Sequence, residues 1–121
     1  MNRLLWICRL KGLVKYMTLL ELADILVTVG VPVNHYNAIK KPDKYIVWAE
    51  DNQADSLYSD DAMQEQVLQG TIDYFTKTEF DTNFDKIQQA LIDNEISFRL
   101  NSVQYEDDTK FIHHEWVFNV V

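Results

Sequence analysis

The residues best suited to acid–base or metal chemistry stand together near the end of the chain, at His113, His114 and Glu115. Imidazole and carboxylate groups bind metals and transfer protons. Because neighbouring side chains of a strand point to opposite faces, His113 and Glu115 share a face that His114 does not. The two histidines therefore cannot bind one metal ion from a flat strand, and a third ligand such as His35 would have to come from elsewhere. A polar strand surface is the simpler interpretation.

Other catalytic motifs are missing from the sequence. Gly12, Gly30 and Gly70 stand singly and cannot form a phosphate-binding loop. The single cysteine, Cys8, cannot form an internal disulfide, and a small apolar residue explains it better than a nucleophile does. There is no nucleophile elbow, paired-cysteine motif or zinc-binding helix motif. We therefore expect a protein without catalytic activity, cofactor or bound metal.

Composition indicates one acidic globular domain. The 121 residues include 19 Asp and Glu against 11 Lys and Arg, for a formal net charge of −8. An acidic surface repels phosphate backbones, so non-specific nucleic-acid binding is not expected. A hydrophobic content of 47% with 12% aromatic residues is enough for a single core.

The first sixteen residues, MNRLLWICRLKGLVKY, are basic and apolar, unlike the rest of the chain. Arg9 and Lys11 interrupt the apolar run and no small-residue cleavage site follows, so a signal peptide is not predicted. The segment is too short to span a membrane. Three interpretations of this segment stay open: a basic amphipathic helix at a membrane surface, an added helix packed on the body or a neighbouring subunit, and an extension ahead of a start at Met17. We expect the domain itself to run from 17 to 121, without membrane association.

Local patterns predict the elements of that domain. Thr18 and Glu21 form a capping box ahead of an apolar helical stripe that Gly30 ends. The stretch 64–91 changes from the two-residue period of a strand to the helical spacing of Phe80, Phe84, Ile87 and Leu91. We expect a helix over 18–29 and a second helix that is capped by Asp81 or Thr82 and ends near Asp93–Asn94, with Asn94 as a left-handed cap. We expect strands over 31–36, 44–50, 64–77, 96–105 and 111–121.

Two predictions concern irregular backbone. Gly70 within a strand indicates a bulge or a close backbone approach. The apolar parity changes between Leu100 and Val103, which indicates either a bulge or a strand that passes from the core to an interface. Residues 51–62 are polar and acidic and are predicted to form a loop, because they lack an apolar alternation. A calcium site there is disfavoured, since the spacing of the carboxylates does not match an EF-hand loop.

Together these elements predict an α+β domain of order α-β-β-β-α-β-β. Consecutive hairpins favour a mostly antiparallel sheet of four to five strands, with two helices packed on one face. Both faces of 44–50 are apolar, so we expect that strand to be central and covered on both sides.

Several stretches resemble one protein family. They are GTIDYFTKTEFD from Gly70, FRLNSVQYEDDTKFIHHEWVF, TLLELADIL, VNHY and PDKYIVWAEDN. This pattern of strands, lengths and aromatic positions over residues 17–121 is similar to the tail terminators, or tail-completion and head–tail joining proteins, of long-tailed phages and prophages of Gram-positive bacteria. The resemblance implies a tail-terminator-like fold and a ring, typically a hexamer, that caps the tail tube and joins it to the head connector. It also implies a place at the head-proximal end of the virion tail, synthesis in the host cytoplasm, and DNA that only passes through the lumen.

Charged loops and edges are the expected assembly interface of such a subunit. The candidate residues are Lys40, Lys41, Asp51, Asp55, Asp60, Asp61, Glu106, Asp107, Asp108 and Lys110. Two other classes of function remain open: a monomeric protein-binding adaptor or regulator, and a hydrolase that uses His113 and Glu115.

Overall fold

A computed structural model describes residues 17–59 and 62–121, with the backbone alone over 53–59 and 62–66. The elements, in chain order, are α2 (Leu19–Val27), β1 (Val33–His35), β2 (Lys44–Ser59), β3 (Ala62–Thr76), α3 (Thr82–Asp93), β4 (Ser97–Tyr105) and β5 (Ile112–Val120). The interpretations of residues 1–16 lie outside the described residues.

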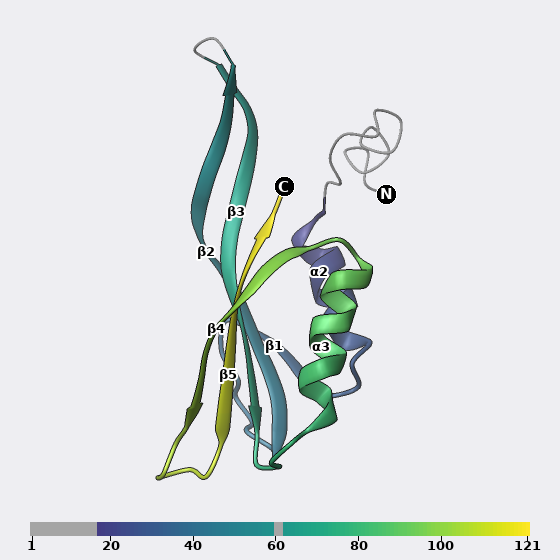
Figure 1. The fold of residues 1–121 in the computed structure, drawn as a ribbon, viewed down its shortest axis with the longest axis vertical. Helices are drawn as coiled ribbons and strands as arrows, with labels where there is room; N and C mark the ends of the chain where they lie inside the picture. The colour runs from purple at the N-terminus through teal and green to yellow at the C-terminus, as the bar shows by residue number, and fades with distance from the viewer. Residues whose placement is uncertain (1–16, 60–61) are drawn as a thin grey trace.

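One five-stranded sheet in the order β1-β2-β3-β5-β4 organises the chain. The short β1 runs parallel to β2, and the other three pairings are antiparallel. Both helices lie on the same side of the sheet (Figure 1). The predicted α+β class, element order and helix placement are therefore confirmed. Among the described residues, no helix is long and apolar enough to span a membrane.

Helix α2 begins as predicted. The Thr18 hydroxyl accepts a hydrogen bond from the Glu21 N–H, and the Glu21 carboxylate accepts one from the Thr18 N–H at 3.0 Å, which completes the capping box. Leu22 and Leu26 are fully buried on the sheet. Gly30 has a φ of 99°, a conformation that glycine adopts without strain, and the helix ends before it.

Helix α3 corrects two predictions. Ile87 and Leu91 are fully buried and Phe84 is half-buried, but Phe80 lies ahead of the helix and is 92% exposed. The helical spacing wrongly placed Phe80 on the helix. Asp81 is the N-cap, so Phe80 precedes the helix, and its φ is 56°. Asn94 is the C-cap with a φ of −104°, and the left-handed residue is the next one, Glu95.

The predicted loop over 51–62 is wrong. Most of it extends β2 and β3, whose strands pair from Lys44↔Thr76 to Ser59↔Ala62. The pairing of backbone groups continues although the sequence is polar, because ladder hydrogen bonds do not need apolar side chains. Beyond Gln53 and Leu68 the two strands pair only with each other in the described part of the chain. We call residues 53–59 and 62–67 the arm, and Figure 1 shows it projecting past the rest of the sheet.

Both predicted bulges are present. The β2–β3 register shifts between Glu50 and Asn52, opposite Gly70. A Cβ at Gly70 would stand 2.1 Å from the Ala49 carbonyl oxygen, so the close backbone approach is confirmed as well. The β4–β5 register shifts between Leu100 and Ser102, which explains the change of apolar parity there.

Two apolar clusters lie on the two faces of the sheet. The main core, between sheet and helices, includes Trp48, Tyr74, Trp116 and Phe118. The second contains Ala38, Tyr45 and Phe111, with Val47 and Phe75 packed against it. Strand β2 lies between β1 and β3 from Ile46 to Trp48, and on its helix-free face Ala38 and Phe111 cover it.

Candidate functional site

A groove of about 480 Å³ lies on the helix-free face of the sheet. It is formed by the chain between Tyr36 and Lys41, by β2, β3 and β5, and by the turn between β4 and β5. We call it the His113 groove. It combines side chains from segments as distant as residues 36 and 115, and it is the place where the predicted chemical cluster and part of the predicted interface meet.

Aromatic rings form one wall of the His113 groove. The rings of Tyr45 and Phe75 stack with centroids 4.8 Å apart, and Phe111 meets Tyr45 edge-on at 5.6 Å. His113 continues the stack, 4.3 Å from Phe75. Strand alternation places these rings side by side, because Tyr45↔Phe75 and Phe75↔His113 are directly opposed pairs.

His113 is held between two carboxylates. Its Nε2 lies 2.7 Å from Oδ1 of Asp73, and its Nδ1 lies 3.8 Å from Oε2 of Glu106. The hydrogen bond to Asp73 raises the pKa of His113; burial lowers it, and the nearby charges of Asp73, Glu106 and Glu115 raise it again, for a net rise. With both ring nitrogens facing carboxylates, the imidazole is arranged to keep a proton rather than to take one from a substrate.

The same face carries a third carboxylate. Glu115 shares the face with His113, as the alternation predicts, and accepts a hydrogen bond of 2.8 Å from the Asn101 amide. Carboxylates beside aromatic rings can bind a cationic side chain of a partner. Within the described ranges, no group of three or more His, Cys, Asp or Glu residues is placed to hold a metal ion.

The other two histidines lie away from this groove. His35 stacks on Trp48 of the main core at 4.0 Å and pairs with Glu50 at 2.7 Å. His114 faces the helix side, with Tyr74 at 5.8 Å and Phe84 at 4.9 Å. Burial lowers the pKa of His114, and its Nδ1 has no hydrogen-bond partner among the described residues. The prediction that adjacent histidines separate is confirmed.

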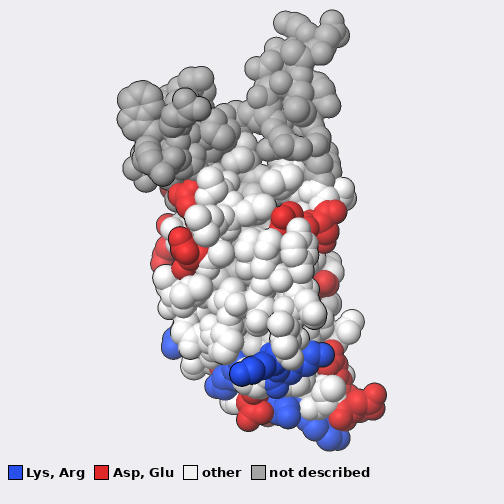
Figure 2. Space-filling view, turned by 180° about the vertical axis from the view of Figure 1, so that it is seen from behind, with Lys and Arg blue, Asp and Glu red and all other residues white. Residues whose placement is uncertain are grey.

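The predicted interface residues fall into two groups. Lys41 and Glu106 line the His113 groove, and Lys40, Asp107, Asp108 and Lys110 are exposed beside it. Asp51 is exposed near the base of the arm, the backbone of Asp55 lies in the arm, and Asp60 and Asp61 lie outside the described residues. Figure 2 shows basic side chains gathered at the end of the molecule opposite the grey segments, with acidic ones among them. The residues of this set that the structure describes therefore do not form one site.

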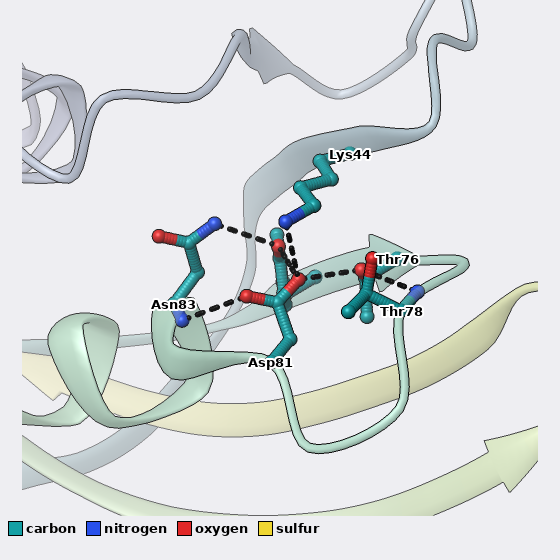
Figure 3. A network of polar contacts seen from close by, with 6 residues as sticks. Lys44, Thr76, Thr78, Asp81 and Asn83 are labelled. Atoms are coloured by element: carbon teal, nitrogen blue, oxygen red, sulfur yellow. Dashed lines mark hydrogen bonds and ion pairs between the residues drawn. The ribbon is translucent and has the colours of Figure 1, made fainter.

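A buried polar network lies on the helix side, where β3 leads into α3 (Figure 3). The Asp81 carboxylate accepts hydrogen bonds from Tyr74 Oη at 2.7 Å, Thr76 Oγ1 at 2.6 Å and the Asn83 N–H at 2.9 Å. The Lys44 ammonium lies 3.3 Å from it. Asp81 thus caps α3 and ties it to β2 and β3.

The network shifts two pKa values in opposite directions. Burial raises the pKa of Asp81, but the hydrogen bonds and Lys44 outweigh it and lower the value to about 2. Burial and the bond to Asp81 raise the pKa of Tyr74 to about 12. Both groups keep one protonation state over the physiological range, so the network acts as a structural cap.

Replacing His113 with glutamine should destabilise the protein more at pH 5.5 than at pH 9. The folded-state pKa of His113 is raised above its ordinary value of about 6.5, so the charged ring stabilises the fold fully below that value. This contribution is lost as pH rises through the folded-state pKa. Urea unfolding of both proteins at the two pH values measures the effect.

The control for His113→Gln is the same substitution in an Asp73→Asn background. Asp73 carries the carboxylate closest to His113. In the Asp73→Asn background, the effect of His113→Gln on the free energy of unfolding should therefore lose most of its pH dependence. If the difference in the free energy of unfolding between wild type and His113→Gln stays constant from pH 5.5 to 9, the charged pair of His113 and Asp73 is contradicted.

Sequence comparison adds no relative: no protein-family model matches the chain, and no curated protein matches it.

Proposed function

We propose that this chain is a structural subunit of a phage tail, which assembles into a ring that caps the tail tube and joins it to the head connector. The proposal rests on the resemblance of residues 17–121 to tail-completion proteins and on the shape of the molecule. The subunit acts by binding, at the head-proximal end of the tail, and performs no reaction.

The arm is the observation that carries the proposal. In the part of the chain that the structure describes, β5 pairs with β3 from Leu68 to Thr76, and β1 pairs with β2 from Ile46 to Trp48. The arm therefore extends beyond the five-stranded body as a two-stranded ribbon (Figure 1). A two-stranded hairpin is marginally stable by itself in water, so a projecting ribbon is suited to contact another subunit or the tube.

Exposed apolar side chains support an assembled state. Ile39 is 93% exposed and Phe80 92% exposed, and Leu100, Val103 and Tyr105 on β4 are each more than two-fifths exposed. A ring buries such side chains through the same contact repeated between neighbours. The acidic balance of the chain, with its net charge of −8, suits a lumen through which DNA slides without binding.

The chemistry of the His113 groove fits a binding role. An acid–base catalyst needs a group that can release or accept a proton near the working pH. The carboxylates on both sides of His113 instead favour its charged form. A subunit that holds partners through charged and aromatic side chains needs no such catalyst.

Tail-tube protein from the phage or prophage that encodes this chain provides the test. We expect the purified protein to form rings at one end of assembled tubes, visible by electron microscopy, and to stop their growth. A variant in which Asn-Gly replaces residues 54–67 should keep the fold, because Gln53 and Leu68 are paired and a two-residue turn can join them. It should no longer cap tubes.

A wild-type chain that stays monomeric and never binds tube ends would contradict the proposal and favour the monomeric adaptor instead. Capping by the arm-shortened variant at wild-type level would show that the arm is not the contact element.

A further inference from the structure

Strand β4 forms a long free edge of the sheet. It has nine residues, pairs with β5 on one side, and has no strand on its other side in the described part of the chain. Free N–H and C=O groups of an edge strand can pair with another chain. The bulge at Asn101 divides this edge, and the stretch from Ser102 to Tyr105 lies beyond it in regular register with β5.

An apolar groove lies beside that stretch, on the helix side. It has a volume of about 430 Å³ and is lined by Phe80, Phe84, Val103, Ile112 and His114, with acidic residues at its rim. We call it the Phe80 groove. Val103 is 51% exposed and Tyr105 58% exposed, so this part of β4 is not covered. The edge therefore offers both backbone pairing and an apolar surface.

Phe80 marks the groove as a contact site. The ring is 92% exposed, and the backbone has a φ of 56°, a left-handed conformation that bulky residues seldom adopt. Contact with a partner would remove this apolar ring from water, and strained backbone positions are common at binding sites.

The chain itself contains a segment that fits this edge. In the described part of the chain, β1 pairs with the outer edge of β2 as far as Trp48. The backbone of β2 from Ala49 to Ser59 has no strand beside it on that edge. That segment contains acidic residues and no Lys or Arg, whereas β4 contains Arg99 and no acidic residue. Pairing of the two strands places Arg99 of β4 near carboxylates of β2.

We propose that the β4 edge and the Phe80 groove of one copy receive the outer edge of β2, from Ala49 to Ser59, of a second copy. The inference rests on the proposed function, because it names the contact that builds the ring. Strands β2 and β4 lie toward opposite edges of the sheet. A contact between different edges is heterologous, and repetition of a heterologous contact closes a ring when the rotation fits.

Cross-linking tests which strands meet, in a Cys8→Ser background. Asn52 is paired with Gln69 and Gln104 with His113, so both side chains face the helix-free side. We expect the double variant Asn52→Cys and Gln104→Cys to give a ladder of covalent oligomers with a short bifunctional thiol reagent. Either single variant should stay uncross-linked. A covalent dimer from Gln104→Cys alone would show that β4 pairs with β4, and would overturn the inference.

Charge at the edge tests the contact without cross-links. Val103→Lys should raise the concentration for half-maximal assembly by about tenfold or more, measured by light scattering. Val27→Lys is the matched control, since Val27 is a valine of similar exposure, 59%, at the end of α2 and away from β4. Both variants should unfold in urea at the wild-type midpoint, which separates lost assembly from lost folding.

The outcomes separate this inference from the proposed function. If Val103→Lys assembles and caps tubes as wild type does, the β4 contact is wrong and the capping function stands. If the cysteine ladder forms but wild type never caps tubes, the contact stands and the function is wrong. A wild-type chain without any self-association overturns the contact outright.

Discussion

Asp81→Ala should lower the free energy of unfolding by about 3–5 kcal/mol at neutral pH, the range expected when one partner of a buried charged network is removed. The Asp81 side chain is only 2% exposed. Its loss removes the N-cap of α3 and leaves the hydroxyls of Tyr74 and Thr76 without their acceptor in a dry environment. Urea unfolding at pH 7 measures the loss.

The effect should shrink in acid, and the sign follows from the pKa. The carboxyl has a pKa of about 2 in the folded protein and 3.8 as its ordinary value, so the carboxylate stabilises the fold above pH 3.8. The difference corresponds to about 2 kcal/mol, which is lost as pH falls through the folded-state value. The difference in the free energy of unfolding between wild type and Asp81→Ala should therefore narrow by about 2 kcal/mol between pH 5 and pH 2, and the rest of it should remain.

Asp85→Asn is the control for this pair. Asp85 is exposed in the first turn of α3, where a negative charge interacts with the helix dipole by about 0.3–1 kcal/mol. If Asp81→Ala costs no more than Asp85→Asn, the buried network does not hold the helix in place.

Local signals predicted the elements whose stability is mostly local. The capping box at Thr18 needs only residues within one turn, and the alternation through Ile72 and Tyr74 reports which face of a strand is buried. Such patterns are visible in a sequence because they depend on residues close in the chain or on the burial of one face of a strand.

The arm was missed because its stability does not come from an apolar pattern. Residues 51–59 are polar, and only their pairing with β3 makes them a strand. Phe80 was misplaced for a related reason: its spacing to Phe84 is helical, but Asp81 is the cap and the helix starts at Thr82. Spacing alone does not report where the first helical hydrogen bond forms.

Part of the His113 groove could be predicted from the sequence. Alternation places His113 and Glu115 on one face without any knowledge of the fold. Asp73 joins them only because β3 and β5 pair with Phe75 opposite His113, and those two residues lie far apart in the sequence. The register between distant strands depends on the whole sheet, so a single sequence did not reveal the Asp73–His113 pair.

Gly70→Ala should be the most damaging single-methyl substitution in the sheet, with a loss of about 3 kcal/mol or more. A Cβ there would stand 2.1 Å from the Ala49 carbonyl oxygen, 2.7 Å from the Phe118 ring and 2.8 Å from the Glu50 Cα. Two of these neighbours are backbone and the third is a fully buried ring, so none can move away cheaply. Urea unfolding measures the loss.

Gly30→Ala separates steric from conformational cost. Gly30 has open space around it but a φ of 99°, so alanine there meets only backbone strain, of about 1–2 kcal/mol. A Gly70→Ala loss no larger than that of Gly30→Ala would mean that β2 and β3 separate easily at this point. The close approach at Gly70 lies opposite the bulge where the β2–β3 register shifts, next to the base of the arm. We therefore expect faster amide exchange at Ala49 and Glu50 in Gly70→Ala, with exchange in α2 unchanged. That result would show that the close contact at Gly70 holds the base of the arm to the body.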